Sequence, residues 1–316
     1  MMSISRPTAI QMAPFSAYLE EELDRRFEII RWFDLDPAAQ QQILSTGDAA
    51  IGAIVTNGHV GCPDALIEAL PGLKIVAIHG VGFDRVNLDL AKRKGVGVST
   101  TPNVLNEDVA DLAVGLVIAL LRAVTPADAF VRAGLWERGD FPLARKVTGR
   151  RFGIVGLGRI GVEIARRLAA FGPVAYTGSK PKDVPYAFHP DARTLARNSD
   201  VLILACPSNE QTRHLVNRDI LDALGPQGYV VNIARGAVVD EAALIAALEE
   251  GRIAGAALDV FEQEPHVPDA LRTSPRVLLT PHIASGTEET RRDMADMVLQ
   301  NLDAMLAGNA LPHALI

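Results

Sequence analysis

The feature that most constrains this chain is the glycine-rich loop Gly156-Leu157-Gly158-Arg159-Ile160-Gly161. It follows the apolar run at residues 152–155 and opens a segment with helical apolar spacing at residues 160–170. In such a loop the first glycine permits a tight turn, the second lets the backbone approach a pyrophosphate, and the third allows close helix–strand packing. The N-terminal amides of the helix then attract the anion. A purely structural turn is the alternative interpretation, but the strand–loop–helix order favours a dinucleotide-binding loop.

Short apolar runs alternate with helical patterns on both sides of this loop, which indicates parallel sheets covered by helices. We expect an α/β protein of two doubly wound parallel-sheet domains, a Rossmann-type cofactor domain nested in a flavodoxin-like substrate domain. Residues 1–100 and 286–316 would form the substrate, or catalytic lid, domain, and residues 101–285 the cofactor domain. The expected strands lie at residues 9–12, 28–32, 51–56, 73–79, 96–99, 152–155, 174–177, 201–205, 229–233, 256–260 and 277–280.

Three further segments organise the chain. A helix is expected over residues 106–122, with Asn106 as its N-cap and two acidic residues in its first turn. Residues 122–149 break the β–α rhythm and are interpreted as an arm. The apolar spacing in residues 288–308 predicts a final helix that returns to the first domain, with a ligand cleft between the domains.

Composition excludes several classes. The net charge is −7 and no run of Lys and Arg stands out, which argues against a nucleic-acid partner. The two cysteines, Cys62 and Cys206, are far apart and fit neither a disulfide framework nor a zinc site. The N-terminus lacks an apolar core of signal-peptide length, and the longest uncharged apolar run, at residues 112–121, is too short to span a bilayer. We therefore expect a cytoplasmic protein without a membrane partner.

The end of the second strand after the glycine loop indicates which cofactor binds. An NAD-binding protein usually carries an acidic residue there for the ribose hydroxyls, but residues 174–181 contain none. Ser179 and Lys180 occupy the position, with Lys182 just beyond. A hydroxyl and ammonium groups suit a 2′-phosphate, so the sequence predicts NADPH over NADH. Solvated loop lysines are the alternative.

Three segments that end apolar strands bring polar residues to one sheet edge. Arg235, Glu264 and His282 lie in the segments that follow the fourth, fifth and sixth expected strands of the second domain. Reduction of a 2-oxoacid needs a cation for the carboxylate, which Arg235 can supply. His282 can be the general acid, and Glu264 can stabilise its protonated form and orient its ring. The hydride comes from the cofactor.

At these residues the chain resembles the D-isomer-specific 2-hydroxyacid dehydrogenase family, and within it the NADP-dependent glyoxylate/hydroxypyruvate reductases and the related hydroxyphenylpyruvate reductases. The resemblance covers nearly the whole chain, and its matching stretches lie at residues 79–84, 101–111, 155–161, 232–241, 257–265 and 279–285. The absent acid after the second strand is a departure from the NAD-using relatives.

The resemblance implies a role for each matching residue. Arg235, Glu264 and His282 would form the catalytic triad. Substrate contacts would come from Arg235 and His282 together with Val55, Asn57, Val81, Gly82 and Trp136. Cofactor contacts would come from Gly156, Leu157, Gly158, Arg159, Ile160, Gly178, Ser179, Lys180, Cys206, Pro207, Ile233, Ala234 and Asp259. The arm at residues 122–149 would embrace a second subunit in a homodimer, and Trp136 would reach the partner's substrate pocket.

Several interpretations stay open at this point. His282 alone could be a structural histidine, Asp84 and Asp259 could be structural turn residues, and Trp136 could serve dimer packing only. The other six histidines show no metal-ligand spacing, so no metal is expected. A same-family reductase of a larger or aromatic 2-oxoacid is the main alternative function. A nucleotide-sensing corepressor-like binding protein is a weaker one, since the chain leaves little room for tails.

Overall fold

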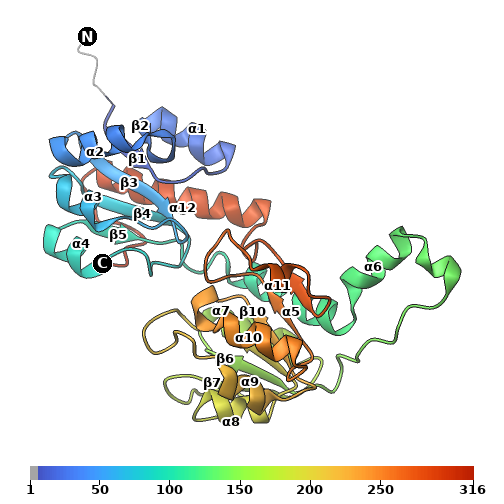
Figure 1. Cartoon of the computed structure of the whole chain (residues 1–316). Helices are drawn as coiled ribbons and strands as arrows, with labels where there is room; N and C mark the ends of the chain where they lie inside the picture. The colour runs from blue at the N-terminus through green and yellow to red at the C-terminus, as the bar shows by residue number, and fades with distance from the viewer. Residues whose placement is uncertain (1–5) are drawn as a thin grey trace. The chain divides into compact units, whose positions relative to one another are not determined.

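The structure, a computed structural model, describes residues 6–316 and divides into two compact α/β units (Figure 1). Unit 1 combines the chain up to Leu105 with Thr287–Ile316, and unit 2 is the continuous segment Asn106–Gly286. Both sheets are entirely parallel in their strand pairs. The expected fold class, two parallel-sheet α/β domains, is confirmed.

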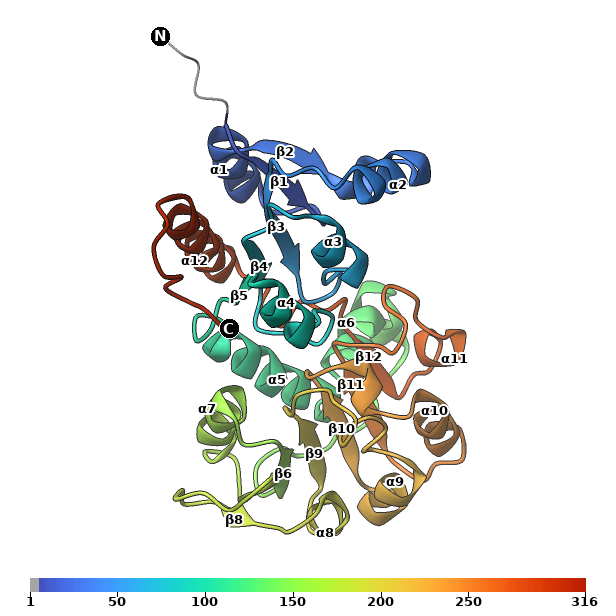
Figure 2. The ribbon, with the colours of Figure 1, turned by 90° about the vertical axis from the view of Figure 1, so that its left-hand side faces the viewer.

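Unit 1 is a five-stranded sheet with helices on both faces (Figure 2). Its elements are β1 (Thr8–Gln11), α1 (Ala17–Arg26), β2 (Glu28–Arg31), η1 (Trp32–Asp34), α2 (Pro37–Thr46), β3 (Ile51–Asn57), α3 (Asp64–Ala69), β4 (Ile75–His79), α4 (Leu88–Lys94), β5 (Gly97–Ser99) and α12 (Glu288–Leu306). The strand order is β2-β1-β3-β4-β5. One core packs this sheet against α1 and α12, and a second core packs its other face against α2, α3 and α4. The last helix therefore belongs to unit 1, as expected.

Local sequence signals explain where several of these helices begin and end. Asp36 caps α2 through the Ala39 amide, and Gly47 ends it in the left-handed region. Asn87 and Gly95 bound α4 in the same way. Asn or Asp before a helix and glycine after it satisfy the backbone groups that a helix end leaves without partners.

Unit 2 is a seven-stranded sheet of order β12-β11-β10-β9-β6-β7-β8. Its elements are α5 (Asn106–Leu121), α6 (Val124–Arg132), η2 (Leu135–Arg138), β6 (Phe152–Val155), α7 (Arg159–Leu168), β7 (Val174–Thr177), β8 (Ala187–Phe188), α8 (Ala192–Arg197), β9 (Val201–Leu204), α9 (Arg218–Leu224), β10 (Tyr229–Asn232), η3 (Gly236–Val238), α10 (Glu241–Glu249), β11 (Gly255–Leu258), α11 (Asp269–Arg272) and β12 (Val277–Leu279). The order reverses between β6 and β9, where a doubly wound sheet holds its ligand.

Some details differ from the sequence prediction. β8 was not expected, because two residues are too few to show a hydrophobic period. Asn106 is the first residue of α5 rather than the residue before it. In the described part of the chain, no single helix is both long and apolar enough to cross a membrane, and only the pair α5 and α6, bent by 61°, passes on length and composition.

Candidate active site

The three glycines of the loop after β6 have distinct structural roles. Gly156 has φ +94°, and a Cβ added there would lie 2.7 Å from the Cα of Cys206. A Cβ on Gly161 would lie 2.2 Å from the Gly156 carbonyl oxygen, so the start of α7 packs directly on the loop. A Cβ on Gly158 would meet nothing within 4 Å. The first and third glycines are required by the protein itself, whereas Gly158 leaves open space in front of the backbone.

This geometry fits a dinucleotide. Gly158 is the N-cap of α7, and no side chain caps that helix end. The first-turn amides of a helix attract anions, and exposed backbone without a Cβ lets a phosphate approach. The close approach of Gly156 to Cys206 also brings the loop after β9 to the same edge, as expected for residues that line one cofactor site.

The loops after β10, β11 and β12 lie side by side because their strands are neighbours. The Asp259 amide donates to the Asn232 carbonyl at 2.9 Å, and the Thr280 amide donates to the Leu258 carbonyl at 3.0 Å. Neighbouring strands are about 4.8 Å apart, so the first and third loops start about 10 Å apart. That distance is within reach of the long side chain of Arg235, which follows β10, and of His282, which follows β12.

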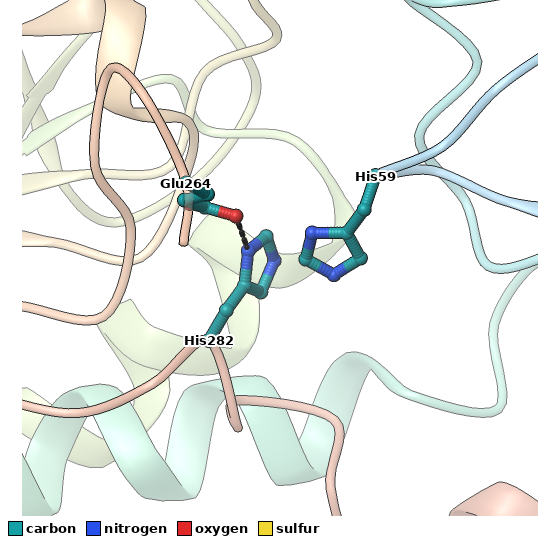
Figure 3. Close-up of side chains that lie close together, drawn as sticks. All are labelled: His59, Glu264 and His282. Carbon is teal, nitrogen blue, oxygen red and sulfur yellow. Dashed lines mark hydrogen bonds and ion pairs between the residues drawn. The ribbon is translucent and has the colours of Figure 1, made fainter. Parts of the chain in front are cut away.

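His282 and Glu264 form a direct pair (Figure 3). The Nδ1 atom of His282 lies 2.9 Å from Oε2 of Glu264, and the other carboxylate oxygen accepts the amide of Phe261 at 2.9 Å. Both side chains are mostly buried, at 24 and 21% exposure. Because each Glu264 oxygen has a fixed donor, the carboxylate holds the imidazole in one orientation. The structure thus brings together the predicted acid and its orienting carboxylate.

Asp259 braces the loop that carries His282. Its side chain is fully buried and accepts from the Thr280 hydroxyl at 2.6 Å and from the amides of Ile283 and Ala284 at 2.8 and 3.0 Å. Burial raises the pKa of Asp259, while these hydrogen bonds and nearby His282 act in the opposite direction. His282 itself has φ +53°, a conformation that costs a non-glycine residue about 1 kcal/mol. Bonds on either side of His282 hold it there.

The loop that carries Glu264 is braced by residues that the sequence pattern did not reveal. Glu241, at the start of α10, accepts the Glu262 amide at 2.8 Å. Burial raises the pKa of Glu241. Gly236 packs so closely that an added Cβ would lie 1.9 Å from the carbonyl carbon of Phe261. Glu241 follows Asp240, the N-cap of α10, which is the local signal that could have drawn attention to this helix start.

Arg235 is supported by its own turn. The Asn232 amide group donates to the Arg235 carbonyl at 3.0 Å, and the Asn232 side-chain oxygen accepts the Ala234 amide at 3.0 Å. The Arg235 guanidinium donates to the Ala234 carbonyl at 2.8 Å. Ile233 and Ala234 are buried beneath this turn. The turn fixes where the arginine leaves the sheet.

The remaining predicted cofactor residues of unit 2 lie at the same edge. Gly178, Ser179 and Lys180 are exposed directly after β7. Cys206 is buried, and burial raises the pKa of its thiol to about 11, so it is a neutral packing group. Pro207 is exposed, and its carbonyl accepts the Thr212 hydroxyl at 2.7 Å.

The predicted substrate residues of unit 1 divide into two kinds. Val55 was expected to line the pocket, but its side chain is fully buried in the core formed with α1 and α12, because alternate positions of β3 face that core. Asn57 ends β3, and its side-chain oxygen accepts the amides of His59 and Val60 at 2.9 Å. Val81 and Gly82 are partly exposed in the loop after β4. Asn57, Val81 and Gly82 stay available at the strand ends, and Val55 does not.

The arm consists of α6, η2 and the extended segment that returns to β6 (Figure 1). Neither α6 nor η2 contains a buried residue. Trp136 is 65% exposed and Leu143 is completely exposed. Beside the arm lies a groove of about 560 Å³, lined mainly by apolar residues of α5, α6 and β12. Exposed apolar surface is common at interaction sites.

Comparison with known proteins identifies the family of the chain. Residues 114–284 match the family described as D-isomer specific 2-hydroxyacid dehydrogenase, NAD binding domain. The chain is 49% identical to a glyoxylate/hydroxypyruvate reductase A of Arabidopsis thaliana and 47% identical to a hydroxyphenylpyruvate reductase of Plectranthus scutellarioides, in each case over 96% of both chains. It is also similar to the crystal structure of an NADPH-dependent glyoxylate/hydroxypyruvate reductase of Sinorhizobium meliloti in complex with NADP and malonate, with a TM-score of 0.90, 39% identity and coverage of 98 and 97% of the two chains. The chain therefore belongs to the D-isomer-specific 2-hydroxyacid dehydrogenase family of oxidoreductases.

Proposed function

We propose that this protein reduces small 2-oxoacids, glyoxylate and hydroxypyruvate first, to 2-hydroxyacids with NADPH. The observation that carries the proposal is the Glu264–His282 pair, joined at 2.9 Å on loops that follow neighbouring strands of the cofactor-type sheet. The glyoxylate/hydroxypyruvate reductase relatives support the substrate class.

In the proposed reaction, Arg235, His282 and Glu264 each have a separate role. Arg235 binds the substrate carboxylate with a planar, permanently charged guanidinium. When bound, NADPH supplies the hydride for the carbonyl carbon. His282 donates a proton to the carbonyl oxygen, so that the product is a neutral hydroxyl. Glu264 holds Nδ1 of His282, so the proton is donated from Nε2, and the carboxylate stabilises the charged imidazolium before that proton leaves.

The cofactor would be held at the carboxyl edge of the unit 2 sheet. Leu157, Gly158, Arg159 and Ile160 would bind the pyrophosphate at the start of α7, and residues 178–180 the 2′-phosphate. Cys206, Pro207, Ile233, Ala234 and Asp259 would line the rest. The lack of a carboxylate in residues 174–181 supports NADPH, because an acid there would repel a 2′-phosphate. Initial rates with NADPH and NADH test this directly, and a clear preference for NADH would refute it.

Replacement of His282 tests the chemistry. His282→Ala should lower kcat by about 10²–10⁴-fold, the usual contribution of a general acid. Glu264→Gln, which keeps the side-chain shape, should lower kcat less and leave cofactor affinity unchanged. Near-wild-type turnover by His282→Ala would remove the histidine from the mechanism.

A second candidate is a reductase of a larger, aromatic 2-oxoacid, which the hydroxyphenylpyruvate reductase relative supports. One or a few carbons in a pocket change specificity by only about 1–3 kcal/mol, so the catalytic motifs do not discriminate between these substrates. A kcat/KM panel of glyoxylate, hydroxypyruvate, pyruvate and hydroxyphenylpyruvate separates the two candidates. Turnover of none of them, with intact cofactor binding, would favour a nucleotide-sensing binding protein instead.

We further infer a homodimer joined through the arm, in a reducing compartment such as the cytoplasm. The exposed apolar residues Val131, Leu135, Trp136 and Leu143 support the dimer, and two free buried cysteines suit a reducing compartment. Analytical ultracentrifugation should give a dimer for the wild type and a monomer for the Val131→Glu/Leu143→Glu variant. If Trp136 reaches the partner's pocket, Trp136→Ala raises KM without dissociating the dimer.

A further inference from the structure

The segment between β7 and β8, residues 178–186, is exposed for most of its length but is fixed at Lys182. The Lys182 amide donates to the hydroxyl oxygen of Tyr176 at 2.6 Å. Tyr176 is almost completely buried, and its ring packs against Phe188 with 5.4 Å between centroids. The backbone of this surface segment is therefore attached to a rigid side chain of the core.

The side chain of Lys182 makes a second attachment, to the glycine loop. Its Nζ donates to the Leu157 carbonyl oxygen at 2.6 Å. Leu157 is itself fixed, because its side chain is buried and Gly156 before it packs on Cys206. The Lys182 ammonium thus joins the end of β7 to the loop that begins α7.

In a doubly wound fold, the start of the first helix and the end of the second strand each bind a defined part of the dinucleotide. The pyrophosphate lies at the helix N-terminus, and the adenosine ribose lies beside the end of the second strand. An ammonium that bridges the two is positioned where the ribose 2′-substituent lies. It has three N–H donors, of which Leu157 takes one, so it can also bind a phosphate oxygen.

Lys180 differs from Lys182 in both respects. Both lysines are exposed, but within residues 6–316 the Lys180 side chain forms no hydrogen bond or ion pair, whereas Lys182 is held through its amide and its ammonium. A lysine side chain without a partner loses more side-chain entropy when it binds a phosphate than one that is already held. Lys182 is already ordered, so more of its interaction energy can contribute to binding.

We propose that Lys182, rather than Lys180, is the main cation that selects the 2′-phosphate of NADPH. Tyr176 and Leu157 act as positioning residues, since they hold Lys182 through its amide and its ammonium. This inference rests on the proposed use of NADPH. Asp183 follows Lys182 directly and is exposed, so the segment carries both charges and its net attraction depends on where Lys182 is held.

Calorimetric binding to matched ligand pairs tests the proposal. The pairs are NADPH against NADH, and adenosine 2′,5′-bisphosphate against adenosine 5′-monophosphate, which differ only in the 2′-phosphate. Lys182→Met removes the charge at similar length, and Lys180→Met is the matched control in the same segment. Lys182→Met removes a charge-assisted hydrogen bond to the phosphate. It should therefore lower the affinity for the 2′-phosphorylated ligands by about tenfold to a hundredfold. The affinities for their unphosphorylated partners should change less than about threefold, and Lys180→Met should lower the affinity for the 2′-phosphorylated ligands by a smaller factor than Lys182→Met does.

Two results would overturn the proposal. Equal losses for both members of a pair would make Lys182 a loop anchor only, and a larger selective loss with Lys180→Met would move the role to Lys180. Lys182→Gln, with thermal unfolding alongside, repeats the test in case the methionine variant does not fold. Tyr176→Phe keeps the charge but removes one positioning contact, so it should give a smaller loss with the same selectivity.

The experiment separates this inference from the proposed function. The wild-type ratio of NADPH to NADH affinity tests the cofactor assignment. The change of that ratio in Lys182→Met tests the lysine. A wild type that favours NADH would refute the cofactor assignment. If Lys182→Met then still lost affinity selectively for the 2′-phosphorylated ligands, the role of Lys182 would be supported.

Discussion

Asp259 gives the sharpest test of how the histidine loop is held. Replacement by Asn keeps the size of the side chain and one acceptor oxygen, which can still bind the Thr280 hydroxyl and the Ile283 amide. The new NH₂ group then faces the Ala284 amide, 3.0 Å away in the wild type, so two donors oppose each other in a fully buried site. One bond to a charged acceptor contributes about 1.5–3 kcal/mol, and an unpaired buried donor costs about 1–3 kcal/mol.

A neutral side chain is easier to bury than a carboxylate, which offsets part of these losses. Asp259→Asn should therefore destabilise the loop that carries His282 by about 2–4 kcal/mol. If the loop relaxes away from its φ +53° conformation at His282, that energy is lost from the transition state. The expected fall in kcat is therefore about 30-fold to 1000-fold. Thr280→Val removes one of the three bonds and leaves no opposed donors, so its effect should be about tenfold or less.

The assay is kcat at saturating substrate and cofactor, with cofactor affinity measured separately by calorimetry. The loss in kcat should exceed any loss of cofactor affinity, because the three bonds of Asp259 hold the histidine loop. A Asp259→Asn enzyme within threefold of wild-type kcat would show that the loop does not depend on these bonds. An equal loss of cofactor affinity would show that Asp259 acts mainly by holding the cofactor rather than the histidine loop.

Three further predictions follow from buried contacts. Burial lowers the pKa of His79 from 6.5 to about 4, so the unfolded chain takes up this proton at a higher pH than the folded protein does. The free energy of unfolding, measured with urea, should be constant above pH 6.5 and fall by up to about 3 kcal/mol between pH 6.5 and 4. His79→Gln should show no such loss from this site. Gly236→Ala should lower the melting temperature and kcat together, because its Cβ would overlap the Phe261 backbone and such overpacking costs about 1–3 kcal/mol; an unchanged melting temperature would mean that the loop yields freely. Glu241→Ala should destabilise the protein by about 1–3 kcal/mol by leaving the Glu262 amide without its acceptor, and Glu241→Gln should recover most of the loss.

The fold could be predicted from the sequence wherever a segment has a clear period or a clear boundary. β6 and α7 were expected at almost their observed positions, because an apolar run, three glycines and a helical repeat follow one another. β8 has two residues and no period, and its place at the sheet edge comes only from pairing with β7. The direction of the final helix back to unit 1 followed from its position after the last strand of unit 2.

The site could be predicted only in part, for a physical reason. Residues at strand ends, such as Arg235 and His282, were found because parallel strands bring their carboxyl ends to one edge. Contacts between side chains and distant backbone groups have no local signature, so the bonds from Lys182 to Leu157 and from Glu262 to Glu241 were not foreseen. Val55 shows the opposite error, since a residue at the right strand has its side chain on the core face.

The discontinuous composition of unit 1 has a consequence for biosynthesis. Unit 2 consists of one continuous segment and can collapse once Gly286 has left the ribosome. The last strand of unit 1 ends at Ser99, but one apolar face of that sheet packs against Ala295, Val298 and Leu302 of α12. At usual elongation rates that face waits about 10–40 s for its covering helix. The nascent chain therefore exposes this apolar face to chaperones while the whole of unit 2, residues 106–286, is synthesised.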